Sequence, residues 1–229
     1  MTYPGGKNTS YQKIINLIPP HEVFVSPYLG SGAIMRNKRL ALRNIGGDLD
    51  KKAFEVFHSL ASPEVRARTE LIILPALDLI KEFGFQCQKS TFIYLDPPYP
   101  FAVRSSKRPL YTHEMGEWED HITLLKLILQ CDCMVMISSY WSELYADMLQ
   151  NWNSHSFQVQ TRGGSTATEW VWMNYPRPER LHDYRYLGND FTQRQQIKRK
   201  KNRNVQKFQN MDPLERAALF WGLEEAGLL

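Results

Sequence analysis

Apolar and polar positions follow two patterns along the first 150 residues. Short, almost wholly apolar runs, VFVSPYLGSG at 23–32 and TFIYL at 91–95, have the length and composition of strands buried on both faces. Helical spacing of apolar residues precedes or follows them, in the segment closed by IINLIPP, at 33–42 and at 51–60. Because strands and helices alternate, the pattern predicts a parallel α/β sheet.

The pattern changes in the second half of the chain. The strand CMVMISS at 133–139 and a helix at 141–149 continue the alternation. SFQVQTR at 156–162 and EWVWMNY at 169–175 then alternate apolar and polar residues and are joined by GGSTATE, which is typical of an antiparallel hairpin. An α/β sheet that finishes in such a hairpin favours a methyltransferase-like Rossmann fold.

Length and composition fit a globular protein. The chain has 229 residues, of which 43% are hydrophobic and 23% charged, so one large domain or one domain with a small appendage is expected. No apolar run approaches the roughly 18 residues that span a bilayer, and the N-terminus lacks the pattern of a secretion signal. We therefore expect a cytoplasmic protein without a membrane partner.

Cysteine and histidine are too sparsely arranged to suggest a metal centre. Cys131 and Cys133 lack the second ligand pair that a zinc site requires, and Cys87 stands alone. The six histidines show no ligand spacing either. The sequence predicts reduced, structural thiols and no metal.

The small net charge of +4 is unevenly distributed. Seven basic residues and no acidic one lie between Arg194 and Lys207, so this segment carries +7 and the remainder carries −3. MDPLERAALFWGLEEAGLL then has the pattern of a helix with Asp212 as N-cap and Pro213 at its first position. The basic segment is either a solvated helix or flexible end, or an arm that binds nucleic-acid phosphates.

Asp96-Pro97-Pro98-Tyr99 is the sharpest chemical signal. It follows a buried strand, at the edge of an α/β sheet where ligands bind. Prolines have no N–H and a fixed φ, so their carbonyls are rigid acceptors, and an ionised aspartate also only accepts. The four residues either form a pocket for a group that presents two hydrogens, such as an exocyclic amine, or merely turn the chain.

Two further segments favour the pocket. Tyr28-Leu29-Gly30-Ser31-Gly32 ends an earlier strand, where glycines allow a ligand to approach the backbone closely. Asp48 follows 18 residues after Gly30, at the position where an acid typically accepts hydrogen bonds from a ribose.

These motifs together resemble the adenine-specific DNA methyltransferases of the DNA adenine methylase (Dam) type, and compact phage-encoded members in particular. Tyr3 to Lys7 (YPGGK) is similar to the N-terminal cofactor motif, Val25 to Gly32 to the glycine motif, Gly47 to Asp50 to the acidic motif, and Asp96 to Tyr99 to the catalytic motif. ISSYWSELY, EWVWMNY and the basic QRQQIKRKKNRN are similar to later segments. The four motifs stand in the order and spacing of the family.

The resemblance implies a site-specific enzyme that transfers a methyl group from S-adenosylmethionine to the N6 of adenine in double-stranded DNA. It implies a catalytic domain over 1–182 and a basic helical extension over 183–229, in a phage-encoded or bacterial protein of the restriction-modification kind. The implied catalytic residues are Asp96, Pro97, Pro98 and Tyr99, and the implied cofactor contacts are Tyr3, Lys7, Tyr28, Gly30, Gly32, Asp48 and Asp96.

The expected chemistry is positioning and electrostatics. Asp96 and the Pro97 carbonyl accept the hydrogens of the adenine amine and favour a tetrahedral nitrogen that can attack the methyl group. The adenine has to be flipped out of the duplex, and Tyr99 is the expected stacking partner.

The chain has few residues available for a segment that recognises the target sequence. Asp96 follows Asp48 by only 48 positions, too few for the large recognition insertion of longer relatives. The candidates for DNA contact are Arg104, Lys107, Arg108, Tyr111, Arg162 and, in the basic segment, Arg199, Lys200 and Lys201. Asp78 is a weaker candidate for the cofactor adenine and fits a helix N-cap better.

Two other functions remain compatible with these residues. One is an RNA adenine methyltransferase on the same fold. The other is a catalytically silent protein that keeps the fold and binds DNA.

Overall fold

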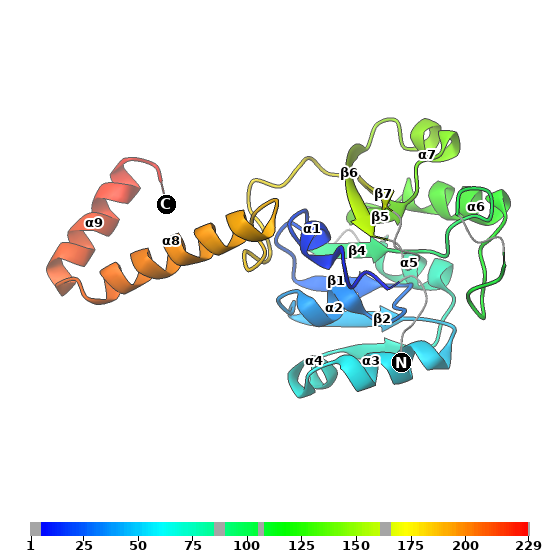
Figure 1. Ribbon diagram of the computed structural model, residues 1–229, viewed down its shortest axis with the longest axis horizontal. Helices are drawn as coiled ribbons and strands as arrows, with labels where there is room; N and C mark the ends of the chain where they lie inside the picture. The colour runs from blue at the N-terminus through cyan, green and yellow to red at the C-terminus, as the bar shows by residue number, and fades with distance from the viewer. Residues whose placement is uncertain (1–5, 85–89, 105–107, 161–165, 229) are drawn as a thin grey trace. The chain divides into compact units, whose positions relative to one another are not determined.

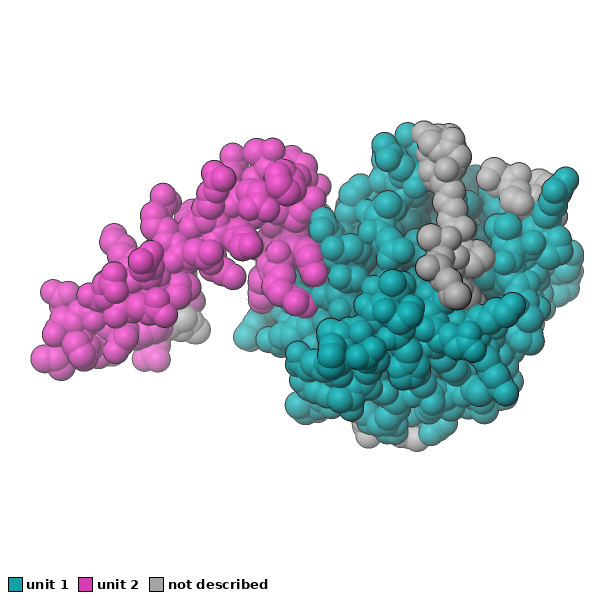
Figure 2. Space-filling view, turned by 60° about the horizontal axis from the view of Figure 1, so that its bottom comes forward, with its two compact units in different colours: residues 1–183 teal, residues 184–229 magenta. Residues whose placement is uncertain are grey.

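The chain forms two compact units, Met1–Asp183 and Tyr184–Leu229, coloured separately in Figure 2. The structure is a computed structural model, and it describes residues 6–84, 90–104, 108–160 and 166–228.

The first unit is built on a seven-stranded sheet with the order β3-β2-β1-β4-β5-β7-β6. The first five strands pair in parallel, and β7 runs antiparallel to both β5 and β6 (Figure 1). The strands are β1 Val23–Ser26, β2 Arg43–Gly47, β3 Glu70–Ile72, β4 Thr91–Leu95, β5 Met134–Ser139, β6 Asn153–Gln160 and β7 Thr166–Met173. The parallel α/β sheet that ends in an antiparallel hairpin, the Rossmann-like methyltransferase fold predicted from the sequence, is confirmed.

Seven helices of the described chain connect and cover these strands. They are α1 Tyr11–Ile15, α2 Ala33–Asn37, α3 Lys51–Leu60, α4 Pro63–Ala67, α5 Ala76–Gly84, α6 Trp118–Ile128 and α7 Glu143–Met148. The helix predicted over 33–42 is shorter than expected, because Lys38 turns the chain into an extended conformation. Its buried ammonium donates to Asn44 Oδ1 at 3.2 Å and to the Arg39 carbonyl at 3.0 Å.

One face of the sheet packs against α5, α6 and α7. Strand residues such as Ile93 and Ile137 form one buried cluster with Leu79 of α5, Leu124 of α6 and Tyr145 of α7. Successive strand residues point to opposite faces. With β4 buried at all five positions, both faces of the central sheet are covered, and the strand edges at the carboxyl end are left to form a site.

The other face carries a column of aromatic rings. Phe24 of β1 stacks on Phe92 of β4 with ring centroids 5.9 Å apart, and His21 stacks on Phe92 at 5.3 Å. His21 also stacks on His182 at 3.8 Å, and the His182 amide donates to the Ile18 carbonyl. These contacts fix the end of the first unit against its N-terminal segment.

The second unit contains two helices, α8 Phe191–Gln209 and α9 Pro213–Glu225. Asp190 caps α8, and Asp212 caps α9 by accepting the Leu214 amide at 2.8 Å, with Pro213 in the first turn as predicted. Phe208 and Phe220 pack with their rings 5.7 Å apart. Neither helix has a buried residue, so the seven basic side chains of α8 stand on a solvated helix.

No helix of the described residues is long and apolar enough to cross a membrane.

Candidate functional site

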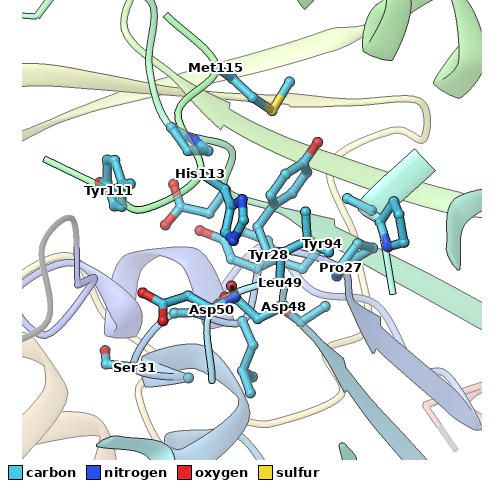
Figure 3. A pocket seen from close by; sticks show the side chains of 18 of the residues that line it. Pro27, Tyr28, Ser31, Asp48, Leu49, Asp50, Tyr94, Tyr111, His113 and Met115 are labelled. Carbon is cyan, nitrogen blue, oxygen red and sulfur yellow. Dashed lines mark hydrogen bonds between the residues drawn. The ribbon is translucent and has the colours of Figure 1, made fainter. Parts of the chain in front are cut away.

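A cavity of about 300 Å³ opens at the carboxyl ends of the parallel strands. Figure 3 shows Ser31, from the turn after β1, with Asp48 and Asp50 at the end of β2, facing Tyr111 and Met115 from the loop that follows β4. Neighbouring strands β1 and β4 are where the order of the sheet reverses, which is the ligand-binding place of open α/β sheets. The sheet therefore places the glycine motif, the acidic motif, and Asp96 and Pro98 of the Asp-Pro-Pro-Tyr motif around one cavity.

The turn after β1 adopts a conformation that favours glycine. Gly30 has a φ of 51° and Gly32 a φ of 64°, both in the left-handed region. A Cβ on Gly32 would lie 2.4 Å from a ring carbon of Phe57 in α3, so there is no room for a side chain. The backbone of this turn lines the cavity directly.

Asp48 holds this turn in place. Its Oδ2 accepts the Gly30 amide at 2.9 Å and its Oδ1 accepts the Asp50 amide at 2.9 Å. A carboxylate offers about four lone-pair sites, so these two bonds leave acceptor capacity that can face the cavity. Burial raises the pKa of Asp48, although the two backbone amides oppose that effect. The site can thus bind a ligand hydroxyl pair while the turn stays ordered.

Asp50 has a mainly structural role beside it. Its carboxylate accepts the Lys52 amide at 3.0 Å as the N-cap of α3, and accepts the Thr112 hydroxyl at 3.0 Å. The second contact fastens the loop after β4 to the end of β2.

Asp96 directly follows β4, lines the cavity and is bonded to Lys7. The Lys7 Nζ lies 2.6 Å from Asp96 Oδ1, 3.0 Å from Glu169 Oε1 and 3.1 Å from the Tyr99 hydroxyl. The Lys7 carbonyl accepts the amides of Ser10 and Tyr11, so the turn that leads into α1 fixes the position of this lysine. Lys7 also lines the cavity, and its predicted cofactor contact stays a prediction.

The charges in this cluster strongly affect one another. Burial raises the pKa of Asp96 to about 6; Lys7 opposes this rise and Glu169 adds to it. Burial alone would lower the pKa of Lys7, but Asp96 and Glu169 together raise it well above its ordinary value. Lys7 is therefore a permanent cation, whereas Asp96 gains and loses its charge in the range around its pKa of about 6.

Tyr99 is not among the described residues that line the cavity. Its hydroxyl donates to Glu169 Oε1 at 3.0 Å, and its ring meets Tyr140 edge-on with centroids 4.8 Å apart. Among the described residues, the tyrosines that line the cavity are Tyr28, Tyr94 and Tyr111. This placement does not support the stacking role predicted for Tyr99, and it makes a tyrosine of the lining the better candidate.

The loop after β4 is folded around a buried ion pair. Arg104 donates to both carboxylate oxygens of Glu114, at 3.0 and 3.2 Å, and to the Arg108 carbonyl at 3.1 Å. Glu114 also accepts the amides of Leu110 and Tyr111. Arg104 is only 7% exposed. Its guanidinium is engaged within the loop, which argues against the contact with DNA that the sequence predicts for it.

The other predicted residues are dispersed. Pro98 lines the cavity with Asp96 and Tyr28, whereas Asp78 is an exposed residue in the first turn of α5 that pairs with Lys81 and is not its N-cap. Arg108 is exposed near the cavity loop, and Arg199, Lys200 and Lys201 are exposed on α8. Tyr3, Lys107 and Arg162 lie outside the described residues.

Sequence reasoning missed Glu169. This residue stands at the start of EWVWMNY on β7 and is only 4% exposed. An acid within a strongly apolar strand was the available signal, because buried carboxylates are rare unless paired. Among the described residues, no group of three or more potential ligands could hold a metal ion.

Comparisons with known proteins place these features in context. No known protein-family profile matches the chain. The type II methyltransferase M1.LlaDCHI of Lactococcus lactis subsp. cremoris is 29% identical over 86 residues, which cover 36% of this chain and 30% of that protein. The matching region thus spans less than a third of that relative's length.

Solved structures also resemble the chain. SMU.1697c of Streptococcus mutans, named as a methyltransferase and solved in complex with SAH, is 11% identical, with 72% of this chain and 95% of that chain covered and a TM-score of 0.44. An rRNA methylase of Streptococcus thermophilus is 14% identical, with 72% and 92% covered and a TM-score of 0.41. By its own sheet order and by the motifs around its cavity, the present chain has the fold of the S-adenosylmethionine-dependent methyltransferases.

Proposed function

We propose that this protein is a DNA methyltransferase that transfers the methyl group of S-adenosylmethionine to the exocyclic N6 of adenine. The observation that carries the proposal is the placement of Asp96 in the cavity that also contains the Gly30–Gly32 turn and Asp48. The sequence match to a type II methyltransferase supports DNA as the substrate.

The residues present fit the cofactor. Asp48 has acceptor capacity left for the two ribose hydroxyls, and the glycine turn exposes backbone to a bulky ligand. Leu49 and Leu77 line the same cavity and offer apolar contacts to a heterocycle. When bound, S-adenosylmethionine supplies a methyl group that its sulfonium makes electrophilic.

Asp96 is the group that acts on the substrate amine. The lone pair of an adenine amine is delocalised into the ring, so the nitrogen is a poor nucleophile. In its ionised form, Asp96 can accept one hydrogen of the amine and the Pro97 carbonyl the other, which favours a tetrahedral nitrogen with an available lone pair. Proline carbonyls in a fixed backbone keep this acceptor pair preorganised.

Tyr111 takes over the stacking role that the sequence suggested for Tyr99. It lines the cavity, and Asp96 contributes, after burial, to raising the pKa of its hydroxyl to about 12, which indicates that the two groups are close. A base flipped toward Asp96 would therefore meet the Tyr111 ring. Base–aromatic stacking contributes about 1–3 kcal/mol.

The direct test is methyl transfer by purified protein from S-adenosylmethionine that carries a labelled methyl group. We expect label in duplex DNA, recovered as N6-methyladenine after digestion to nucleosides, and little in RNA of the same sequence. Label in RNA alone would favour the RNA adenine methyltransferase. DNA binding without cofactor binding in calorimetry would favour a catalytically silent binder.

Tyr111→Ala should lower kcat/KM for DNA by about ten- to a hundredfold, as expected from removing one stacking partner. Cofactor affinity, measured by calorimetry, should change much less. Tyr111→Phe keeps the ring and is the matched control, with activity close to that of the wild type. A Tyr111→Phe variant as impaired as Tyr111→Ala would mean that the hydroxyl, not the ring, is the functional part.

A further inference from the structure

Glu169 is a buried carboxylate for which the methyl-transfer chemistry has no direct use. Its side chain is 6% exposed, and it stands on β7 two strands away from Asp96 in the sheet. Its Oε1 lies 3.0 Å from Lys7 Nζ and accepts the Tyr99 hydroxyl at 3.0 Å. Burying a carboxylate is costly unless it is paired, so these contacts define the environment of Glu169.

Lys7 connects the two carboxylates. An ammonium has three N–H donors, and those of Lys7 face Asp96, Glu169 and the Tyr99 hydroxyl within 3.1 Å. One positive charge is thus shared by two negative ones. A stronger or weaker ion pair between Glu169 and Lys7 therefore changes the strength of the ion pair between Lys7 and Asp96.

We propose that Glu169 is a positioning residue of the methyl-transfer site: by competing with Asp96 for Lys7 and by fixing Tyr99, it sets the orientation and basicity of the Asp96 carboxylate. The proposal deepens the proposed function and rests on it for the kinetic test. Glu169 itself does not touch the substrate.

This competition for Lys7 affects how well Asp96 accepts a hydrogen from the substrate amine. Without Glu169, Asp96 would be the only carboxylate of this cluster that Lys7 contacts, and a carboxylate that does not share its cation is a weaker acceptor for an amine hydrogen. Without Lys7, Asp96 would face an unshielded second carboxylate in a buried site, where like charges destabilise the ionised form. Together, Lys7 and Glu169 keep Asp96 ionised near neutral pH and still able to accept a hydrogen bond from the amine.

Among the described residues, Lys7 from the N-terminal turn and Glu169 from β7 are the charged side chains with the largest effects on the pKa of Asp96. Five tyrosines interact electrostatically with Asp96. Each has a raised pKa, with burial as the main cause, and therefore stays protonated. They are Tyr94, Tyr99, Tyr111, Tyr140 and Tyr145.

Two substitutions should shift the pH dependence in opposite directions. Glu169→Gln removes the neighbouring negative charge, so the pKa of Asp96 should fall from about 6 and the acid limb of the kcat/KM profile should move to lower pH. Lys7→Met removes the cation, so the same limb should move to higher pH. Each shift should be on the order of one pH unit.

Glu70→Gln is the control. Tyr99→Phe is a comparison variant: the bond from its hydroxyl lowers the pKa of Asp96, so its loss should move the acid limb to higher pH, opposite to Glu169→Gln. Glu70 on β3 forms an exposed ion pair with Arg43, and its replacement should leave the profile unchanged. A merely structural role for Glu169 would lower thermal stability and scale activity at all pH values without moving the limb.

A second readout needs no substrate. The pKa of Asp96 can be followed by the chemical shift of its carboxyl carbon in protein labelled with ¹³C-aspartate, with Asp96→Asn used to assign the signal. Opposite shifts in Glu169→Gln and Lys7→Met support the proposal even if the protein methylates a substrate other than DNA. An Asp96 titration that Glu169→Gln does not lower overturns it, whatever the activity of the wild type.

Discussion

Asp96→Asn is expected to abolish methyl transfer, with a loss in kcat of at least a hundred- to a thousandfold, the scale for removing one preorganised polar group from a reacting centre. Asparagine has nearly the same shape, but only one of its two polar atoms accepts hydrogens. Lys7 Nζ donates to Oδ1 at 2.6 Å and would hold that oxygen, so the adenine amine would meet the amide NH2, a donor, instead of an acceptor. The effect should therefore appear in the chemical step.

The fold should survive this substitution. Lys7 keeps its contacts with Glu169 at 3.0 Å and with Tyr99, so removing the Asp96 charge leaves no unpaired buried cation. Single-turnover transfer of a labelled methyl group measures the step, and calorimetry with S-adenosylmethionine checks that the cofactor still binds. Asp147→Asn, at an exposed position of α7, is the matched control. Retained activity in Asp96→Asn would remove Asp96 from the chemistry.

The parts of the site that follow from local sequence were predictable. The apolar run at 91–95 and the prolines behind it indicate a buried strand that stops at Asp96, and the structure places β4 there. Gly30 and Asp48 follow strands that are consecutive in the sequence, so their contact at 2.9 Å follows from the parallel pairing of β1 with β2. Each inference needed only a local pattern and one neighbouring strand.

The role of Glu169 could not be predicted from the sequence, because it depends on the order of the strands in the sheet. β7 inserts between β5 and β6 and runs antiparallel to both, and this pairing brings its first buried residue toward the Lys7 side of the sheet end. Alternation along a strand gives its buried face but not which strands lie beside it. An isolated acid in EWVWMNY could therefore be recognised as unusual, but not as a partner of Lys7.

Loop side chains show a second limit. A basic residue in a polar loop predicts solvent exposure, yet Arg104 is buried against Glu114 ten residues later and lies over the Phe101 ring at 4.4 Å. The same fold of the loop places Tyr111 in the cavity. Which side chain of such a loop turns inward depends on contacts that no periodicity encodes.

Removing positive charge from α8 is expected to weaken DNA binding at least about tenfold at low salt. It should also flatten the salt dependence of binding, because each phosphate that is no longer neutralised reduces the slope of log K against log salt by about 0.9. Helical geometry places six of the seven basic residues in two stripes, leaving Lys200 aside: Arg199, Arg203 and Lys207 recur every four residues on one side, and Arg194, Lys198 and Lys201 lie on the other.

These stripes provide a matched pair of variants. Each triple substitution to glutamine removes three charges from the same helix, so any difference between the two reports orientation rather than total charge. If one stripe faces the phosphates, its variant should lose up to about 2.7 units of slope while the other stays close to the wild type. Fluorescence anisotropy with a labelled duplex, over a salt range of about 50 to 200 mM, measures both. Equal, small losses of slope in both variants would indicate long-range attraction to DNA without direct phosphate contacts. A phosphate-binding arm cannot lose three cations without releasing fewer counterions. An unchanged slope in both variants would therefore leave α8 as a solvated helix.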